Sequence, residues 1–207
     1  MFDWRDRLYA FMRALPAWQR AQAGLHLVMQ YPTEVPGVLV VAAMNEALAA
    51  RGASTDDLVG RLAAEAKRIG FDPALLHRPL NVDLSGGEKK RNETLQLAVL
   101  APRIAILDEL DSGLDIDALR DCARRVEDLT NDLGLGVLAI THYTRLLAEL
   151  RPDHVHILVK GRIVARGGAE LADQLEVDGY AAFAPEADLH DPAVPTRPGS
   201  LDELFAL

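Results

Sequence analysis

Two short apolar segments, each followed by polar residues, constrain the fold of this chain more than any other feature. Residues 104–107 lead into Asp108 and Glu109, and residues 137–140 lead into Thr141 and His142. A stretch with helical apolar spacing separates the two segments. Such alternation is typical of α/β domains whose parallel strands are covered on both faces. The sequence therefore predicts a parallel sheet core with polar side chains at its carboxyl edge.

Three further patterns extend this α/β interpretation. Residues 25–29 form a short apolar strand that ends at Gln30, and 38–76 have helical spacing, which predicts a helical subdomain over about 38–84. Residues 88–101 and 116–133 are expected to be helices. Alternating apolar residues over 154–166 predict a C-terminal β-hairpin.

The ends of the chain differ from its body. We expect an atypical helical segment over 1–23, a partial domain over 24–183, and a flexible, acidic, proline-rich tail over 184–207.

Composition excludes several classes of protein. The formal net charge of −9 argues against a nucleic-acid binder, and the single cysteine, Cys122, excludes a disulfide framework or a cysteine-ligated metal centre. The longest apolar run, 38–44, is too short to cross a bilayer, which needs about 20 residues. Charges within the first residues argue against an export signal, so we expect a cytoplasmic protein without direct membrane insertion.

The pentapeptide Leu-Ser-Gly-Gly-Glu at 84–88 is the strongest local motif. Ser85 and Glu88 have the spacing of a capping box, and Gly86 and Gly87 permit another molecule to approach the backbone. A helix N-terminus exposed in this way can bind an anion. An ordinary helix cap is the alternative, and the basic residues 89–91 that follow are interpreted as solvated or partner-facing.

The carboxylates after the first apolar segment can support phosphate chemistry. One carboxylate of the pair Asp108 and Glu109 can hold a hydrated Mg²⁺, while its neighbour orients or deprotonates an attacking water. A lone histidine at a strand end, such as His142, is more often structural than functional. Gln30 by itself does not indicate a functional site. The turn at 111–115 is expected to cap the next helix.

Taken in order, these motifs resemble those of an ATP-binding-cassette (ABC) ATPase. Gln30, 84–88, Asp108-Glu109, 112–115 and His142 resemble its Q-loop, signature, Walker B, D-loop and H-switch. The longer wording of 30–37, 85–92 and 107–119 looks like the SufC-type ATPase of the SUF iron-sulfur cluster assembly machinery. The resemblance implies an incomplete ABC ATPase domain of the P-loop NTPase type.

The resemblance also implies a role for each matched residue. Ser85, Gly86 and Gly87 would contact the γ-phosphate of an ATP held by the opposite subunit of a head-to-tail dimer, with Glu88 in the same motif. Gln30 and Asp108 would serve Mg²⁺, Glu109 and His142 would be catalytic, and Asp115 would couple the two sites. The implied partners are SufB- and SufD-like scaffold proteins.

One motif of the family is missing from the 207 residues. No Gly-x-x-x-x-Gly-Lys-Ser/Thr (Walker A) occurs. Because this loop supplies hydrogen bonds to the phosphates, we expect this polypeptide alone to bind ATP roughly 10³ to 10⁶ times more weakly than a cassette that has the loop. We also expect apolar faces of the sheet to be exposed. A fragment, a misplaced start or a rearranged gene would each explain the absence.

Three functions follow from these observations. The first is an ATP-binding and hydrolysing subunit of iron-sulfur cluster assembly, impaired in this chain. The second is a non-catalytic subunit that lends 85–87 to an intact homologue. The third is the nucleotide-binding domain of an ABC transporter.

Overall fold

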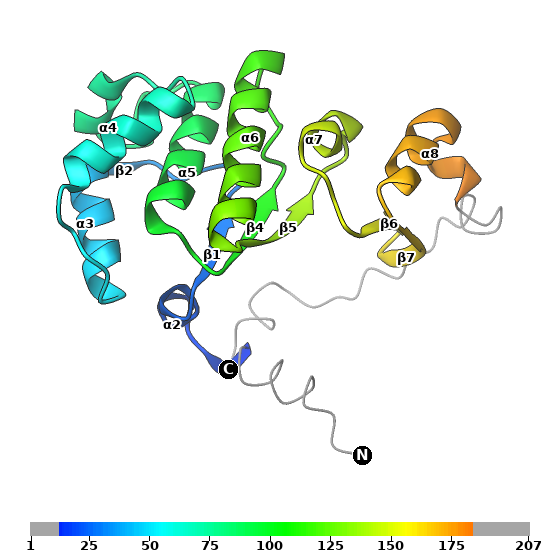
Figure 1. Cartoon of the computed structure of the whole chain (residues 1–207), viewed down its shortest axis with the longest axis horizontal. Coiled ribbons are helices and arrows are strands. Elements are labelled where there is room, and N and C mark those ends of the chain that lie inside the picture. Colours follow the sequence, from blue (N-terminus) through cyan, green and yellow to red (C-terminus); the bar gives the residue numbers. More distant parts are fainter. Residues whose placement is uncertain (1–12, 184–207) are drawn as a thin grey trace. The chain divides into compact units, whose positions relative to one another are not determined.

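The computed structural model describes residues 13–183, and the chain divides into two compact units between Arg151 and Pro152 (Figure 1). The flexible tail expected over 184–207 lies outside the described residues, as do the first twelve positions of the expected helical segment. Within that segment, α2 covers Ala17–Gln22. The predicted extent of the domain, 24–183, stays a prediction.

The first unit contains the predicted parallel sheet. Strands β1 (Leu25–Val28), β4 (Ile104–Asp108) and β5 (Gly136–Ile140) lie in the order β1-β4-β5, and both pairings are parallel. The register places Leu27 beside Ile106, and Ile106 beside Leu138. The α/β fold with a parallel sheet is confirmed.

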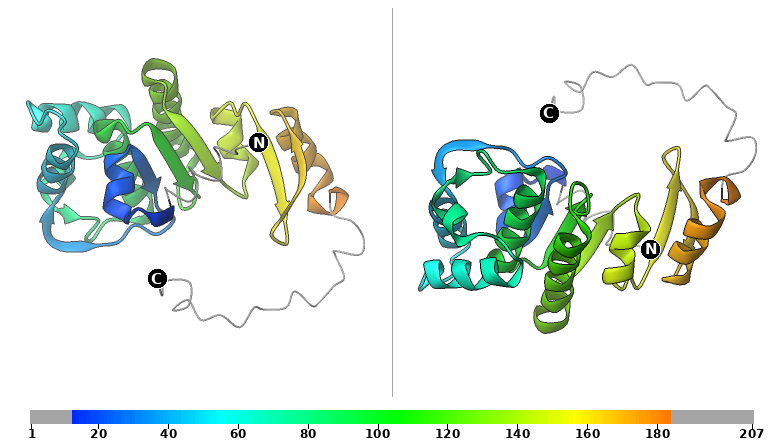
Figure 2. Two further views of the ribbon diagram at one scale, coloured as in Figure 1. Left: turned by 90° about the horizontal axis from the view of Figure 1, so that it is seen from below. Right: turned by 90° about the horizontal axis from the view of Figure 1, so that it is seen from above.

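Two long helices, α5 (Gly86–Leu100) and α6 (Ile116–Leu133), lie on the same side of this sheet (Figures 1 and 2). Asp115 caps α6 by accepting a hydrogen bond from the backbone N–H of Ala118 at 2.7 Å. The helix ends at Gly134, whose φ of 69° is the left-handed conformation that glycine adopts without strain. The short helix α7 (Thr144–Glu149) follows β5 and was not predicted.

Only one face of the sheet is covered by the described residues. Ala105 and Leu107 of β4 pack in a core with buried side chains of α6. The opposite face is apolar and open, because Leu27, Ile104 and Leu138 are each about half exposed. The expectation of cover on both faces is therefore wrong for this part of the chain. The expectation that apolar faces are exposed is confirmed.

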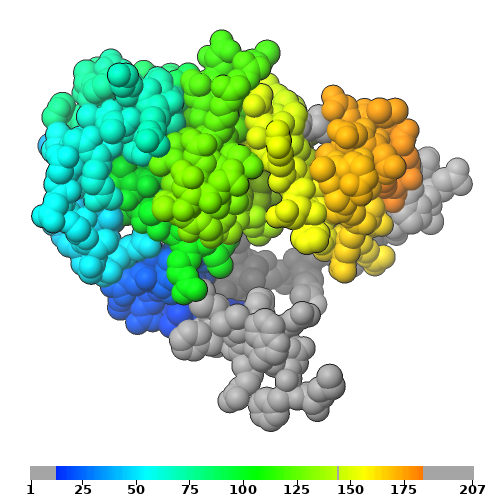
Figure 3. Space-filling view, viewed as in Figure 1, coloured from blue at the N-terminus to red at the C-terminus, as the bar shows by residue number. Residues whose placement is uncertain are grey.

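A helical region with its own core adjoins the sheet. It contains α3 (Val40–Ala50), α4 (Leu58–Arg68) and the 3₁₀ helix η1 (Pro73–His77), and it forms a continuous surface in Figure 3. Helical structure predicted from residue 38 begins only at residue 40. Residues 38 and 39 belong instead to β2 (Val35–Leu39), which pairs with β3 (Pro79–Leu80).

The second unit contains the predicted hairpin. Strands β6 (Val155–Val159) and β7 (Arg162–Gly167) are antiparallel. Lys160 and Gly161 both have positive φ, 47° and 76°, as a tight two-residue turn requires. The elements α8 (Glu170–Asp178) and η2 (Tyr180–Ala182) follow it and were not predicted. Among the helices of residues 13–183, none combines the length and the apolar character needed to cross a bilayer.

Candidate functional site

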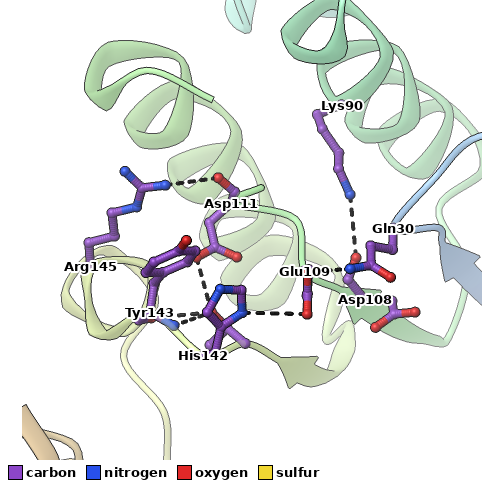
Figure 4. A network of polar contacts seen from close by, with 9 residues as sticks. Gln30, Lys90, Asp108, Glu109, Asp111, His142, Tyr143 and Arg145 are labelled. Carbon is purple, nitrogen blue, oxygen red and sulfur yellow. Dashed lines mark hydrogen bonds and ion pairs between the residues drawn. The ribbon is translucent and has the colours of Figure 1, made fainter. Parts of the chain in front are cut away.

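Four of the predicted site residues meet at the carboxyl edge of the sheet. Gln30 follows β1, Asp108 ends β4, Glu109 comes next, and His142 follows β5. Because parallel strands end at the same edge, the topology brings these side chains together from segments more than a hundred residues apart (Figure 4). The sequence-based prediction of a polar edge is confirmed.

Glu109 lies at the centre of this group. Its Oε2 accepts a hydrogen bond from Nε2 of Gln30 at 2.5 Å, and its Oε1 lies 3.4 Å from Nδ1 of His142. The backbone N–H of Glu109 donates to the carbonyl of Ile140 at 2.9 Å. The Glu109 φ of 47° is uncommon for a residue with a side chain. One carboxylate is thus oriented by groups that follow both neighbouring strands.

A buried lysine ties two of these strand ends to α5. Nζ of Lys90 donates to the carbonyls of Met29 and Asp108 at 2.9 and 3.3 Å. Burial lowers the pKa of Lys90, and nearby carboxylates, first Glu93, oppose that shift. The interpretation of 89–91 as solvated or partner-facing is therefore wrong for Lys90, which is 2% exposed.

Glu93 adds a second tie between α5 and the segment before Gln30. Its Oε2 accepts from the backbone N–H of Met29 at 3.3 Å, and burial raises the pKa of its carboxyl group. Sequence reasoning missed both Lys90 and Glu93. Apolar spacing could not have found them, because every residue of α5 from 92 to 99 is buried and the helix has no single apolar stripe.

The signature segment forms the predicted capping box. Oγ of Ser85 accepts from the backbone N–H of Glu88 at 3.3 Å, and the backbone N–H of Ser85 donates to Oε2 of Glu88 at 2.7 Å. The Ser85 hydroxyl also donates to Oε2 of Glu88 at 2.7 Å, and this bond, followed by the one from the Ser85 backbone N–H, lowers the pKa of Glu88. The carboxylate of Glu88 is therefore engaged within its own helix terminus.

The start of α5 lies beside the turn that precedes α6. A side chain added at Gly87 would meet the carbonyl of Gly113 at 3.7 Å. Within residues 13–183, no hydrogen bond or ion pair joins Ser85, Gly86 or Gly87 to the Glu109 group. The signature and the carboxylate edge are thus two separate parts of the candidate site.

The residues proposed for Mg²⁺ have suitable donor atoms but do not form a complete cage. The carboxylate of Asp108 and the amide oxygen of Gln30 are hard oxygen donors at neighbouring strand ends. In the part of the chain that the structure describes, no three His, Cys, Asp or Glu residues could hold a metal together. This donor set fits Mg²⁺ bound jointly with water and phosphate oxygens.

Curated relatives are similar to most of this chain. It is 44% identical over 181 residues to Vegetative protein 296 of Bacillus subtilis, covering 85% of the chain and 69% of that protein. It is 45% identical over 171 residues to a probable ABC transporter ATP-binding protein of Streptococcus pyogenes, covering 80% and 66%. The chain therefore spans about two thirds of the length of these relatives. No family model matches it.

Solved structures share the fold at lower sequence identity. The ATP-binding subunit of an ABC transporter aligns with a TM-score of 0.63 and 23% identity, covering 89% of this chain and 68% of that one. A dimeric ATP-binding cassette bound to ADP and Pi aligns with a TM-score of 0.64 and 16% identity, covering 75% and 68%.

Proposed function

This chain belongs to the ABC ATPase family, and on that premise we propose that it takes part in ATP binding and hydrolysis as one member of a head-to-tail dimer of cassettes. The observation that carries the proposal is the orientation of Glu109 by Gln30 and His142 at the carboxyl edge of the sheet. The solved dimeric cassette with ADP and Pi supports a dimer as the working form.

The geometry around Glu109 suits activation of water. A carboxylate that already accepts from Gln30 and faces His142 is held in one orientation, so it can accept a proton from a water placed beside it. His142 is half exposed, so its ring also borders the solvent side of this edge, where a phosphate would lie. Asp108 and Gln30 would hold Mg²⁺ together with the phosphate, and the Mg²⁺ would neutralise charge on the phosphate oxygens.

The signature segment supplies a second, complementary surface. Ser85, Gly86 and Gly87 begin a helix of 15 residues, where backbone N–H groups and the helix dipole favour a phosphate. The capping box fixes the terminus without a bulky side chain over its glycines. In the proposed dimer this segment faces the nucleotide of the partner cassette, and Asp115, as the cap of α6, supports the adjoining turn.

Complementation of an intact relative tests the proposal, since the 207 residues contain no Walker A motif. The relative carries an arginine in place of its own signature serine, so only this chain can complete its site. Mixing the two should restore ATP hydrolysis, and Ser85→Arg in this chain should abolish the gain. The same change at the exposed Ser54, Ser54→Arg, should preserve it. Hydrolysis that is not restored, or that survives Ser85→Arg, would contradict the proposal.

For the working partner of the cassette, we propose the scaffold of iron-sulfur cluster assembly, of the SufB and SufD type. The wording of 30–37, 85–92 and 107–119 supports this assignment, and a transporter's membrane subunit is the second candidate, favoured by the relatives' names. Tyr31 is 79% exposed beside the helical region, where scaffold contact is expected. Tyr31→Ser should weaken copurification with such a scaffold, whereas Tyr180→Ser should not. Copurification that Tyr31→Ser leaves unchanged would contradict the contact at Tyr31, and no copurification of the original chain would favour the transporter assignment.

A further inference from the structure

We propose that Asp111 is a positioning residue, which holds the turn that carries His142 and thereby sets the imidazole against Glu109. The inference rests on the proposed function, because it concerns the same carboxylate edge. It assigns a role to Asp111, Thr141 and Arg145, none of which the sequence motifs single out as a site residue.

Asp111 contacts the His142 segment at two points. Its Oδ2 accepts a hydrogen bond from Oγ1 of Thr141 at 3.0 Å, immediately before His142. Its backbone carbonyl accepts from Nη2 of Arg145 at 3.1 Å, three residues after His142. The segment is therefore held on both sides of the imidazole (Figure 4).

The Thr141 hydroxyl connects Asp111 to the backbone of the turn. It accepts from the N–H of Tyr143 at 2.9 Å and has one proton to donate. Both Oδ2 of Asp111, at 3.0 Å, and the carbonyl of Tyr143, at 3.2 Å, lie within reach of that proton. The carboxylate is the stronger acceptor because it is charged. Thr141 thus links Asp111, through two hydrogen bonds, to the backbone of the residue after His142.

Asp111 is well suited to act as a fixed point. It is fully buried, and the turn that contains it closes with a bond from Ser112 N–H to the Glu109 carbonyl at 3.0 Å. Its Oδ1 has no hydrogen-bond partner in residues 13–183, so the only side-chain bond of this buried carboxylate there goes to Thr141. A buried carboxylate oxygen without a hydrogen-bond partner lowers the stability of the fold, so stability of the turn alone does not explain an aspartate at position 111.

The imidazole of His142 is also packed against the side chain of a neighbouring residue. The His142 and Tyr143 rings lie 3.9 Å apart between centroids, and the Arg145 guanidinium lies 4.8 Å from the centroid of the Tyr143 ring. Arg145 therefore touches both Asp111 and the aromatic neighbour of His142. The loop that presents Glu109 also positions the residue that faces it.

Nitrogen NMR of the full 207-residue chain tests the inference without nucleotide. A hydrogen bond to Glu109 requires the proton on Nδ1, so the His142 ring, assigned with His142→Gln, should show the Nδ1–H tautomer. Thr141→Val keeps the side-chain shape and removes the hydroxyl. It should shift His142 toward Nε2–H and speed hydrogen exchange of the Tyr143 amide about tenfold. Thr141→Ser, which keeps the hydroxyl, should retain the original tautomer and slow exchange.

A double-variant cycle separates Asp111 from a general effect on the turn. Asp111→Leu should shift the His142 tautomer as Thr141→Val does, and combining the two should shift it little further, because both remove the hydrogen bond between Thr141 and Asp111. The bond from the Tyr143 N–H to Thr141 is lost only in Thr141→Val. Ring signals of His142 that are unchanged in Thr141→Val would overturn the inference. A loss of the Nδ1–H tautomer in Thr141→Ser as large as in Thr141→Val would do the same. If Asp111→Leu does not fold, the Thr141→Val and Thr141→Ser pair still decides. Failed complementation of hydrolysis would contradict the proposed function but would leave this ring measurement intact.

Discussion

The helical region and the three-stranded sheet of the first unit both carry many apolar residues, yet only the helical region encloses them. Leu62 of α4 is 0% exposed within a core shared by α3, α4, η1 and α5. Leu138 of β5 is 56% exposed on the open face of the sheet. The same residue type is thus interior in one region and surface in the other.

The geometry of the two kinds of element explains this difference. A helix satisfies its own backbone hydrogen bonds and buries one stripe, so a few short helices can enclose a core between them. A strand presents side chains alternately to two faces, and a parallel sheet needs cover on both. Among residues 13–183, the helical region therefore encloses its core, whereas the sheet is covered on one face only.

The largest expected effect is on the helical core. Leu62→Ala should lower the free energy of unfolding by about 2 to 5 kcal/mol, because it leaves a cavity in a packed interior. Chemical denaturation monitored by circular dichroism measures the change. Val59→Ala in the same helix, at a position that is 56% exposed, should change stability by less than about 1 kcal/mol. Equal effects of the two changes would show that the helical core is not specifically packed.

An intermediate effect is expected on the covered face of the sheet, at His26. Burial, and secondly the charge of Arg51, lower the pKa of His26 from 6.5 to about 4. Between these values the unfolded chain binds a proton that the folded chain excludes. The contribution to stability is therefore fully present above pH 6.5 and falls by up to about 3 kcal/mol as the pH drops to 4.

Replacement of His26 tests this pH dependence. His26→Phe should remove that part of the loss of stability between pH 7 and pH 4, measured by urea unfolding at each pH. The exposed His154 provides the control, and His154→Phe should leave the pH dependence as it is. If His26→Phe has the same pH profile as the original chain, His26 is solvated and the covered face is less closed than described.

The smallest effect on stability is expected on the open face. Leu138→Thr should change the free energy of unfolding by no more than about 0.5 kcal/mol, because Leu138 makes little buried contact. The same change should reduce self-association of the chain, since exposed apolar patches promote it. Sedimentation velocity over a range of concentrations measures association. A large loss of stability would mean that this face is covered and would remove the contrast with Leu62.

Much of the site could be predicted because its signals are local. The capping box depends on two residues three positions apart, and Ser85 and Glu88 form it as expected. Asp108 and Glu109 lie at a strand end because a short apolar run precedes them. The roles of Ser85, Glu109 and His142 in nucleotide chemistry stay predictions, which the complementation experiment addresses.

Other features could not be read from neighbouring residues. Lys90 belongs to a basic run that looks solvated, but the packing of α5 against the strand ends buries it. Strand β2 replaces the predicted start of a helix because it pairs with β3, about forty residues away. Partners distant in sequence decide both outcomes, and local apolar spacing carries no information about them.

By itself, the sequence determined the order of the three sheet strands, the two long helices between them and the hairpin, together with the capping box and the placement of polar residues at strand ends. These depend on spacings of two to four residues, which backbone geometry converts directly into local structure. The tertiary structure decided which face of the sheet is covered, that Gln30 and His142 both contact Glu109, and that Asp111 reaches Thr141. Those contacts join segments 30 to 80 residues apart, and only packing of the whole unit brings them within hydrogen-bonding distance.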